Sequence, residues 1–211
     1  MAGISCSTSH AAPSGFPAPP AEQPAGVEAV NEEGEAVAVL AGGCFWCTEA
    51  VFERLAGVKT VVSGYAGGTA EDADYKKVSG GLTEHAEAIK IVYDPAQTRF
   101  LDLLEVFFAV AHNPTHVNRQ GNDHGPQYRS AVFYANDAQK AAAEAYIQEI
   151  DASGVYPDPV ATKMEPLNRF YEAEPYHQDY AANNPDNPYV RGVGQPKVDK
   201  LEKSFPERLK K

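Results

Sequence analysis

Hydrophobic residues form short, regularly spaced groups from residue 36 onward, whereas the stretch before them has no such order. Residues 36–40 are all apolar, which is typical of a short buried strand, and Gly42-Gly43 ends it. Residues 58–65 are rich in β-branched side chains and predict a second strand. Residues 86–93 predict a third strand, because their side chains alternate between two faces. One face has Ala86, Ala88, Lys90 and Val92, and the other has Glu87, Ile89, Ile91 and Tyr93.

Helical spacing follows the first strand and recurs twice more. Cys44 is expected at a turn that leads into a helix, which continues through Leu55 and is stopped by Gly57. Apolar residues at helical spacing predict an amphipathic helix over residues 100–111 that packs on the sheet. Asp137 is expected to cap an alanine-rich helix that reaches Ile150.

The remaining segments have less pattern. Residues 130–134 and 160–162 predict two further strands, and the loop 66–69 is expected to be mobile. Residues 112–128 form a long polar loop without a period, and such loops inside compact domains are usually functional. The chain from Asn168 on is rich in aromatic residues, Pro and Asn, and is expected to wrap the domain as short helices and coil.

These patterns divide the chain into three parts. Residues 1–35 contain five prolines among Ala, Ser, Gly and Glu, and predict a flexible Pro/Ala-rich arm. Residues 36–200 are expected to form the single catalytic domain, and residues 201–211 a charged C-terminal tail. A chain of 211 residues is long enough for one domain with a substantial core.

Composition and charge exclude several classes of protein. The chain is 43% hydrophobic and 22% charged, as expected for a soluble globular protein. Its formal net charge of −11 disfavours binding to nucleic acid or an anionic membrane. No apolar run approaches the roughly 20 residues that a membrane helix needs. Residues 1–6 show no intact signal peptide, so a cytoplasmic location is expected; a periplasmic or lipid-anchored one is the alternative if they are the remnant of an export signal.

Cys44 and Cys47 lie on either side of the only tryptophan of the chain. Two thiols at i and i+3 where a strand leads into a helix can form a disulfide, bind a soft metal, or act as nucleophile and resolving thiol. A helix N-terminus stabilises a thiolate, so we expect a lowered pKa for Cys44. Cys47, one turn on, is placed to condense with a sulfenic acid formed on Cys44. Phe45 and Trp46 are suited to wall a pocket for a small apolar group, and their alternative role is core packing.

Two other kinds of protein use such a cysteine pair. A zinc site needs two more ligands, and His112 and His116 have the i, i+4 spacing, but Pro114 between them argues against a common helical face. Thiol-disulfide oxidoreductases also place a CxxC motif at a helix start. Thioredoxin-type motifs normally have Trp before the first cysteine, whereas Gly43 precedes it here. A zinc-binding module and a general thiol-disulfide oxidoreductase stay as alternatives.

Five segments, taken together and in this order, resemble the A-type peptide methionine sulfoxide reductases: residues 42–47, 63–68, 85–87, 120–130 and 173–178. The resemblance implies an α/β (α+β) fold, a two-layer sandwich with a mixed, ferredoxin-like sheet and a long irregular C-terminal wrap. It also implies the reduction of methionine-S-sulfoxide, free or in proteins, as a repair of oxidative damage.

The resemblance assigns catalytic roles to particular residues. Cys44 would attack the sulfoxide sulfur as a thiolate and become a sulfenic acid, and Cys47 would convert it into a disulfide. Glu87 would protonate the departing oxygen, and a carboxyl in a partly dry pocket should have the raised pKa that this role requires. Tyr75 and Tyr128 would donate hydrogen bonds to the same oxygen.

The resemblance also implies the binding site and the partners. Phe45, Trp46, Asp123, His177 and Tyr180 would contact the substrate, and Tyr189 is a weaker candidate at the pocket edge. No bound metal, flavin or nicotinamide is expected, and thioredoxin or another dithiol would supply electrons to a monomer. Many members carry further cysteines near the C-terminus, but this chain has none after Cys47. Resolution would then use Cys47, Cys6 or an external thiol, of which Cys47 is the best placed.

Overall fold

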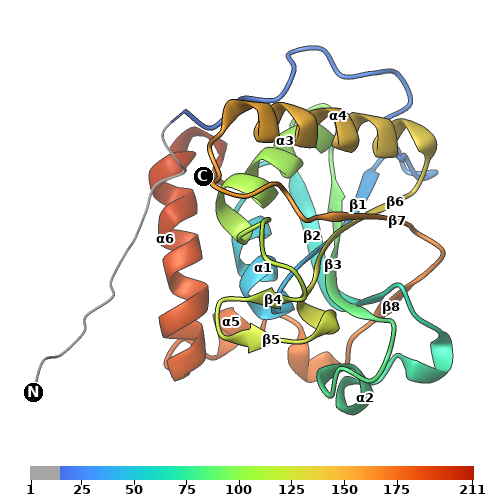
Figure 1. The fold of residues 1–211 in the computed structure, drawn as a ribbon, viewed down its shortest axis with the longest axis vertical. Helices are drawn as coiled ribbons and strands as arrows, with labels where there is room; N and C mark the ends of the chain where they lie inside the picture. The colour runs from blue at the N-terminus through green and yellow to red at the C-terminus, as the bar shows by residue number, and fades with distance from the viewer. Residues whose placement is uncertain (1–14) are drawn as a thin grey trace, which may run out of the picture.

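The computed structural model describes residues 15–211, which form an α/β protein around a mixed sheet (Figure 1). Six strands lie in the order β7-β6-β1-β3-β2-β8, and every neighbouring pair is antiparallel except β6 and β7. Their bounds are β1 Ala36–Gly42, β2 Val58–Ala66, β3 Ala86–Tyr93, β6 Ser130–Tyr134, β7 Lys163–Pro166 and β8 Phe170–Glu172. A separate hairpin joins β4, Arg119–Gln120, to β5, Asp123–His124. The mixed sheet confirms the α/β class expected from the sequence.

Helices cover one face of this sheet. The α-helices in residues 15–211 are α1 Phe45–Phe52, α2 Tyr75–Ser79, α3 Phe100–Val106, α4 Asp137–Ser153, α5 Tyr180–Asn183 and α6 Gln195–Ser204. Ile89 and Ile91 of β3 join the large core together with helix residues such as Phe52. Ala88, directly before Ile89, belongs to a smaller cluster on the opposite face. The alternation of residues 86–93 is therefore confirmed. No helix in residues 15–211 is long and apolar enough to cross a membrane.

Four local expectations are wrong in detail. Helix α1 ends at Phe52 and does not reach Leu55, which forms a β-bridge with Leu209. Asn136, not Asp137, caps α4, because its side chain accepts the backbone N–H of Gln139 at 2.8 Å. Residues 160–162 are coil, and the strand begins at Lys163, where parallel pairing with β6 starts. The helix over residues 100–111 widens into a π-helical turn from Phe107 to Ala111.

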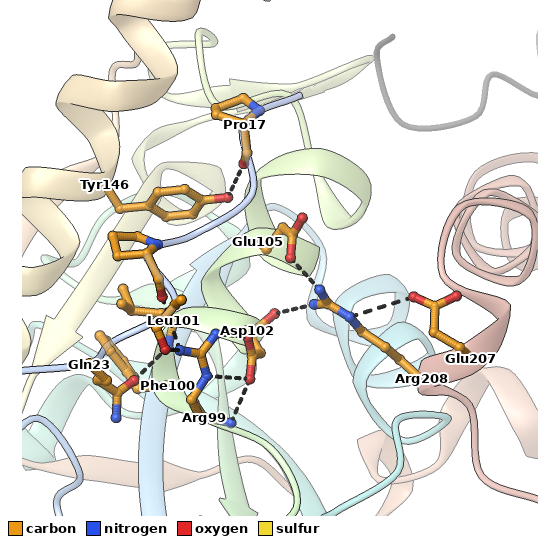
Figure 2. A network of polar contacts seen from close by, with 12 residues as sticks. Pro17, Gln23, Arg99, Phe100, Leu101, Asp102, Glu105, Tyr146, Glu207 and Arg208 are labelled. Atoms are coloured by element: carbon orange, nitrogen blue, oxygen red, sulfur yellow. Dashed lines mark hydrogen bonds and ion pairs between the residues drawn. The ribbon is translucent and has the colours of Figure 1, made fainter. Parts of the chain in front are cut away.

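The described part of the expected N-terminal arm, residues 15–35, packs against the domain (Figure 2). The Tyr146 hydroxyl donates to the Pro17 carbonyl at 2.7 Å, and the Leu101 N–H donates to the Gln23 side chain at 3.2 Å. Val27 is completely buried. Residues 1–14, including Cys6 and the candidate export remnant, lie outside the described residues.

Residues 201–211, expected as a charged tail, are also folded onto the domain. Leu201 is completely buried, and Leu209 forms a β-bridge with Leu55 of the segment after α1. Figure 2 shows the guanidinium of Arg208 bound to the Glu105 carboxylate, whose side chain is only 7% exposed. The C-terminus therefore closes over α3 through a largely buried ion pair.

Replacing Arg208 with alanine is expected to lower the free energy of unfolding. The change leaves the Glu105 carboxylate without its ion-pair partner at a site with little solvent. We expect a loss of about 2–3 kcal/mol, below the range for fully buried pairs because the Arg208 side chain is itself 29% exposed. Urea unfolding measures the effect. Arg54→Ala is the matched control, since its contact with Glu202 is long and solvent-exposed, and it should cost under about 1 kcal/mol. Equal losses of unfolding free energy in the two variants would show that the ion pair of Arg208 with Glu105 contributes no more than an exposed one.

Candidate active site

Cys44 is placed by the two glycines that precede it. Strand β1 ends at Gly42, and Gly43 has φ of +87°, a conformation that favours glycine. A Cβ atom on Gly43 would lie 2.5 Å from the Gln120 side chain, so the turn also has no room for one. Cys44 is then the N-cap residue of α1, as the sequence predicts.

The two thiols form a buried, interacting pair. Cys44 is 8% exposed and Cys47 1% exposed, and both are free thiols. A hydrogen bond from Cys44 lowers the pKa of Cys47 to about 7. Burial raises the pKa of Cys44, and the neighbouring Cys47 and Glu87 raise it further. The expected low pKa of Cys44 is therefore wrong for the reduced pair, because burial outweighs the favourable helix end.

Glu87 lies on β3 beneath the N-terminus of α1. Its side chain is 2% exposed and accepts the backbone N–H of Phe45 at 3.1 Å. Burial raises its pKa to about 8, more than the Phe45 hydrogen bond lowers it. The direction agrees with the expectation from the sequence. At neutral pH the Glu87 carboxyl is therefore mostly protonated, and it lies near Cys44, the N-cap residue of α1.

Two tyrosines lie close enough to this carboxyl to be affected by its charge. Tyr75 is the first residue of α2, and its ring stacks on that of Phe45 with centroids 6.5 Å apart. Tyr128 ends a 3₁₀ turn in the long loop that contains the β4–β5 hairpin. Burial, Glu87 and Cys44 raise the pKa of Tyr75 to about 12, and the same three causes raise that of Tyr128. Both hydroxyls stay protonated, so they can donate hydrogen bonds at neutral pH.

An aromatic wall borders the pair of thiols. The Trp46 ring stacks on that of Tyr180 at 3.8 Å, and its indole N–H donates to Nδ1 of His177 at 3.1 Å. Phe45 is 1% exposed and belongs to the main core, so core packing is part of its role. Because Nδ1 of His177 accepts a hydrogen bond, its proton is on Nε2, which is buried without a partner. Burial lowers the pKa of His177, which favours the neutral ring.

Tyr189 lies deeper in the site than the sequence suggests. Its hydroxyl donates to the Asp123 carboxylate on β5. The same side chain lies near both thiols, and its interaction with Cys47 helps to lower the pKa of that thiol. Asp123 is thus joined to the cysteines through Tyr189. The spacing of aromatic residues near the C-terminus carries no signal for this contact.

Three other acidic residues around the site, Glu174, Glu49 and Glu53, were not singled out by sequence reasoning. Glu174 accepts the backbone N–H of Tyr75 at 3.0 Å and the hydroxyl of Tyr65 at 2.8 Å. Glu49 is 1% exposed and accepts the Ser63 hydroxyl at 3.0 Å. Burial raises the pKa of Glu49 to about 7 and, with Asp179, that of Glu53 to about 8. The only sequence signal was that Glu174 falls within one of the five segments.

The candidate zinc ligands from the sequence serve other contacts. The two ring nitrogens of buried His112 bond to the Phe107 carbonyl at 2.9 Å and the Ser130 hydroxyl at 2.6 Å. His116 pairs with the Asn113 side chain. Within residues 15–211, no group of three or more His, Cys, Asp or Glu side chains is arranged to hold a metal ion.

Comparison with known proteins agrees with this geometry. The family model for peptide methionine sulfoxide reductase matches residues 36–209. The chain is 50% identical to peptide methionine sulfoxide reductase MsrA 1 of Rhodopirellula baltica, over 87% of this chain and 94% of that one. It is 49% identical to MsrA of Thermus thermophilus, over 83% and 98%.

Solved structures show the same similarity. Reduced Mxr1 of Saccharomyces cerevisiae aligns with a TM-score of 0.68 at 33% identity, covering 76% of this chain and 91% of that one. Methionine sulfoxide reductase A of Corynebacterium diphtheriae aligns with a TM-score of 0.63, also at 33% identity, covering 81% and 86%.

Proposed function

This chain belongs to the peptide methionine sulfoxide reductase family, and on that basis we propose which of its residues carry out each step. The reaction is the reduction of methionine sulfoxide, and the protein is a peptide-methionine (S)-S-oxide reductase. The observation that carries the proposal is the buried Glu87 carboxyl beside Cys44. Its raised pKa, about 8, supplies an acid next to a nucleophile at neutral pH.

The scaffold supports this assignment. Strands β6, β1, β3 and β2 lie in that order, and the chain connects them as β-α-β-β-α-β, with helices packed on one face. We infer from this a two-layer, ferredoxin-like arrangement. It makes β1 and β3 neighbours, so the cysteine that follows β1 lies close to the carboxyl carried at the start of β3.

In the first step, Cys44 attacks the sulfoxide sulfur. Its proton passes to Cys47, whose pKa of about 7 suits it as a local base. The Glu87 carboxyl protonates the sulfoxide oxygen as its bond to sulfur breaks, and the oxygen leaves with Cys44 as a sulfenic acid. Methionine is released and Glu87 is left ionised. The hydroxyls of Tyr75 and Tyr128 stabilise the negative charge that develops on the oxygen.

In the second step, the Cys47 thiol attacks the sulfenic acid. A disulfide between Cys47 and Cys44 forms and one water molecule leaves, so the enzyme loses two thiols for each methionine made. A dithiol reductant, thioredoxin in this proposal, restores both thiols by disulfide exchange. The redox equivalents then come entirely from thiols, without a bound cofactor.

The aromatic wall and its polar neighbours hold the substrate. Trp46, stacked on Tyr180, offers an apolar surface for the substrate methyl group, and Phe45 supports it from below. His177 has a buried Nε2 hydrogen without a partner, which suits it to bind a carbonyl oxygen of the substrate methionine. Asp123, held by Tyr189, would accept a substrate N–H.

A single-turnover assay tests this proposal. Reduced protein mixed with the S epimer of a blocked methionine sulfoxide, without reductant, should form about one methionine and lose two thiols per chain. The R epimer should give none. Cys47→Ser is the matched variant: it should still form about one methionine, but lose only the Cys44 thiol and fail to turn over with thioredoxin. No methionine from either epimer, with reduction of insulin disulfides instead, would favour a general thiol-disulfide oxidoreductase. Full recycling by Cys47→Ser would place the resolving thiol elsewhere.

A further inference from the structure

Glu174 connects the sheet to the short helix that carries Tyr75. One carboxylate oxygen accepts the backbone N–H of Tyr75 at 3.0 Å, and the other accepts the hydroxyl of Tyr65 at 2.8 Å. Tyr65 is completely buried on β2, directly opposite Glu87 of β3. Glu174 therefore ties Tyr75 to the same part of the sheet that holds the proposed acid.

Helix α2 depends on such contacts for its position. It has only five residues, too few for a stable helix without support from the rest of the fold. The Asp74 side chain accepts the N–H groups of Lys76 at 3.0 Å and Lys77 at 3.4 Å. The N–H of Tyr75 is directed to Glu174 instead. Without that carboxylate, the first N–H of the helix loses its acceptor, and the link to β2 is lost with it.

The ring of Tyr75 is held between two other parts of the site. Its centroid is 4.3 Å from that of His177 and 6.5 Å from that of Phe45. Glu174 also begins the 3₁₀ turn that carries His177, and its carboxylate is 3.9 Å from Nε2 of that histidine. A shift of Glu174 would thus move Tyr75 relative to both neighbours.

We infer that Glu174 is the positioning residue for Tyr75, and that its two hydrogen bonds fix the phenol where it can donate to the sulfoxide oxygen. This inference rests on the proposed function, in which Tyr75 is that donor. Glu174 touches no reacting atom and acts through Tyr75. The ionised carboxylate suits the task, because it can accept both bonds at once; although burial opposes ionisation, these hydrogen bonds hold the pKa of Glu174 below its usual value.

A double-mutant cycle tests whether Glu174 acts through Tyr75. The measurement is the single-turnover rate of methionine formation from the blocked S-sulfoxide at saturating substrate. Glu174→Ala should slow it by roughly 10- to 100-fold, the effect of misplacing one group by about 1 Å. Tyr75→Phe should slow it by a similar or larger factor. The double variant should be no slower than Tyr75→Phe alone, because no hydroxyl is left to position.

The controls separate positioning from general damage. Glu172→Ala, two residues earlier on β8 and exposed, should keep the wild-type rate. Glu174→Gln should fall between wild type and Glu174→Ala, since its amide oxygen replaces only one acceptor; it also serves if Glu174→Ala does not fold. Losses that multiply in the double variant would overturn the inference, as would a wild-type rate for either Glu174 variant that folds. A wild-type rate for Tyr75→Phe would overturn it too, while S-sulfoxide turnover by the wild-type protein would still uphold the proposed reaction.

Discussion

Replacing Cys44 with serine is expected to abolish the reduction of methionine sulfoxide, by more than roughly a thousandfold, as removal of a nucleophile does in other enzymes. Serine fills almost the same volume at the N-cap of α1, so the turn made by Gly42 and Gly43 and the contact of Phe45 with Glu87 should persist. The hydroxyl is far less acidic and less nucleophilic than the thiol. The hydroxyl would also lack a base strong enough to take its proton, because Cys47, with a pKa of about 7, can accept a proton from a thiol but not readily from an alcohol.

Methionine formation from the blocked S-sulfoxide, with and without thioredoxin, measures this loss. Cys47→Ser is the control, because it also replaces a thiol with a hydroxyl, one turn further along the helix. It should make about one methionine per chain, whereas Cys44→Ser should make none. About one methionine per chain from Cys44→Ser, with none from Cys47→Ser, would remove Cys44 from the role of nucleophile and move that role to Cys47.

Replacing Glu87 with glutamine is expected to slow the first step by roughly 100- to 10,000-fold at neutral pH, the usual contribution of general acid catalysis. Glutamine keeps the size of the side chain and can accept the Phe45 N–H, but it has no proton to give. Recycling of the disulfide by thioredoxin should be nearly unchanged. A wild-type single-turnover rate would show that the oxygen takes its proton from another group.

The pH dependence of the first step identifies the acid more closely. The wild-type rate should fall as pH rises through about 8, where Glu87 loses its proton, and as pH falls through about 7, where Cys47 becomes protonated. Glu87→Gln should keep the lower limb and lose the upper one. Folding raises the pKa of this carboxyl from 4.5 to about 8, so its contribution to stability falls between these two pH values and levels off above about 8. The glutamine variant should therefore be at least as stable as wild type at pH 8.5, which excludes unfolding as the cause of a lower rate.

The elements that the sequence predicts well are those with a strong local pattern. The alternation of residues 86–93 places Glu87 on the correct face of β3, because each side chain of a strand points opposite to the next. The i, i+3 cysteines and the glycines before them place Cys44 at the start of α1. Both inferences need only a few neighbouring residues.

Interactions between distant parts of the chain could not be predicted in this way. The pKa of Cys44 depends on how much of the fold covers it, so reasoning from the helix end alone gave the wrong direction. Glu174 meets Tyr75 across 99 positions of sequence. In the N- and C-terminal segments, the contacts of the Pro17 carbonyl with Tyr146 and of Arg208 with Glu105 join residues far apart in sequence, so local patterns do not reveal them.

The buried carboxyls around α1 change the charge that the folded protein carries. Glu49, Glu53 and Glu87 have pKa values of about 7, 8 and 8, so at pH 7 they retain most of the protons that exposed glutamates would have released. The native chain is then roughly two units less negative than its formal charge of −11. Unfolding near neutral pH exposes these groups to water and gives their protons to the buffer. The heat of unfolding will therefore include the ionisation heat of whichever buffer takes them up.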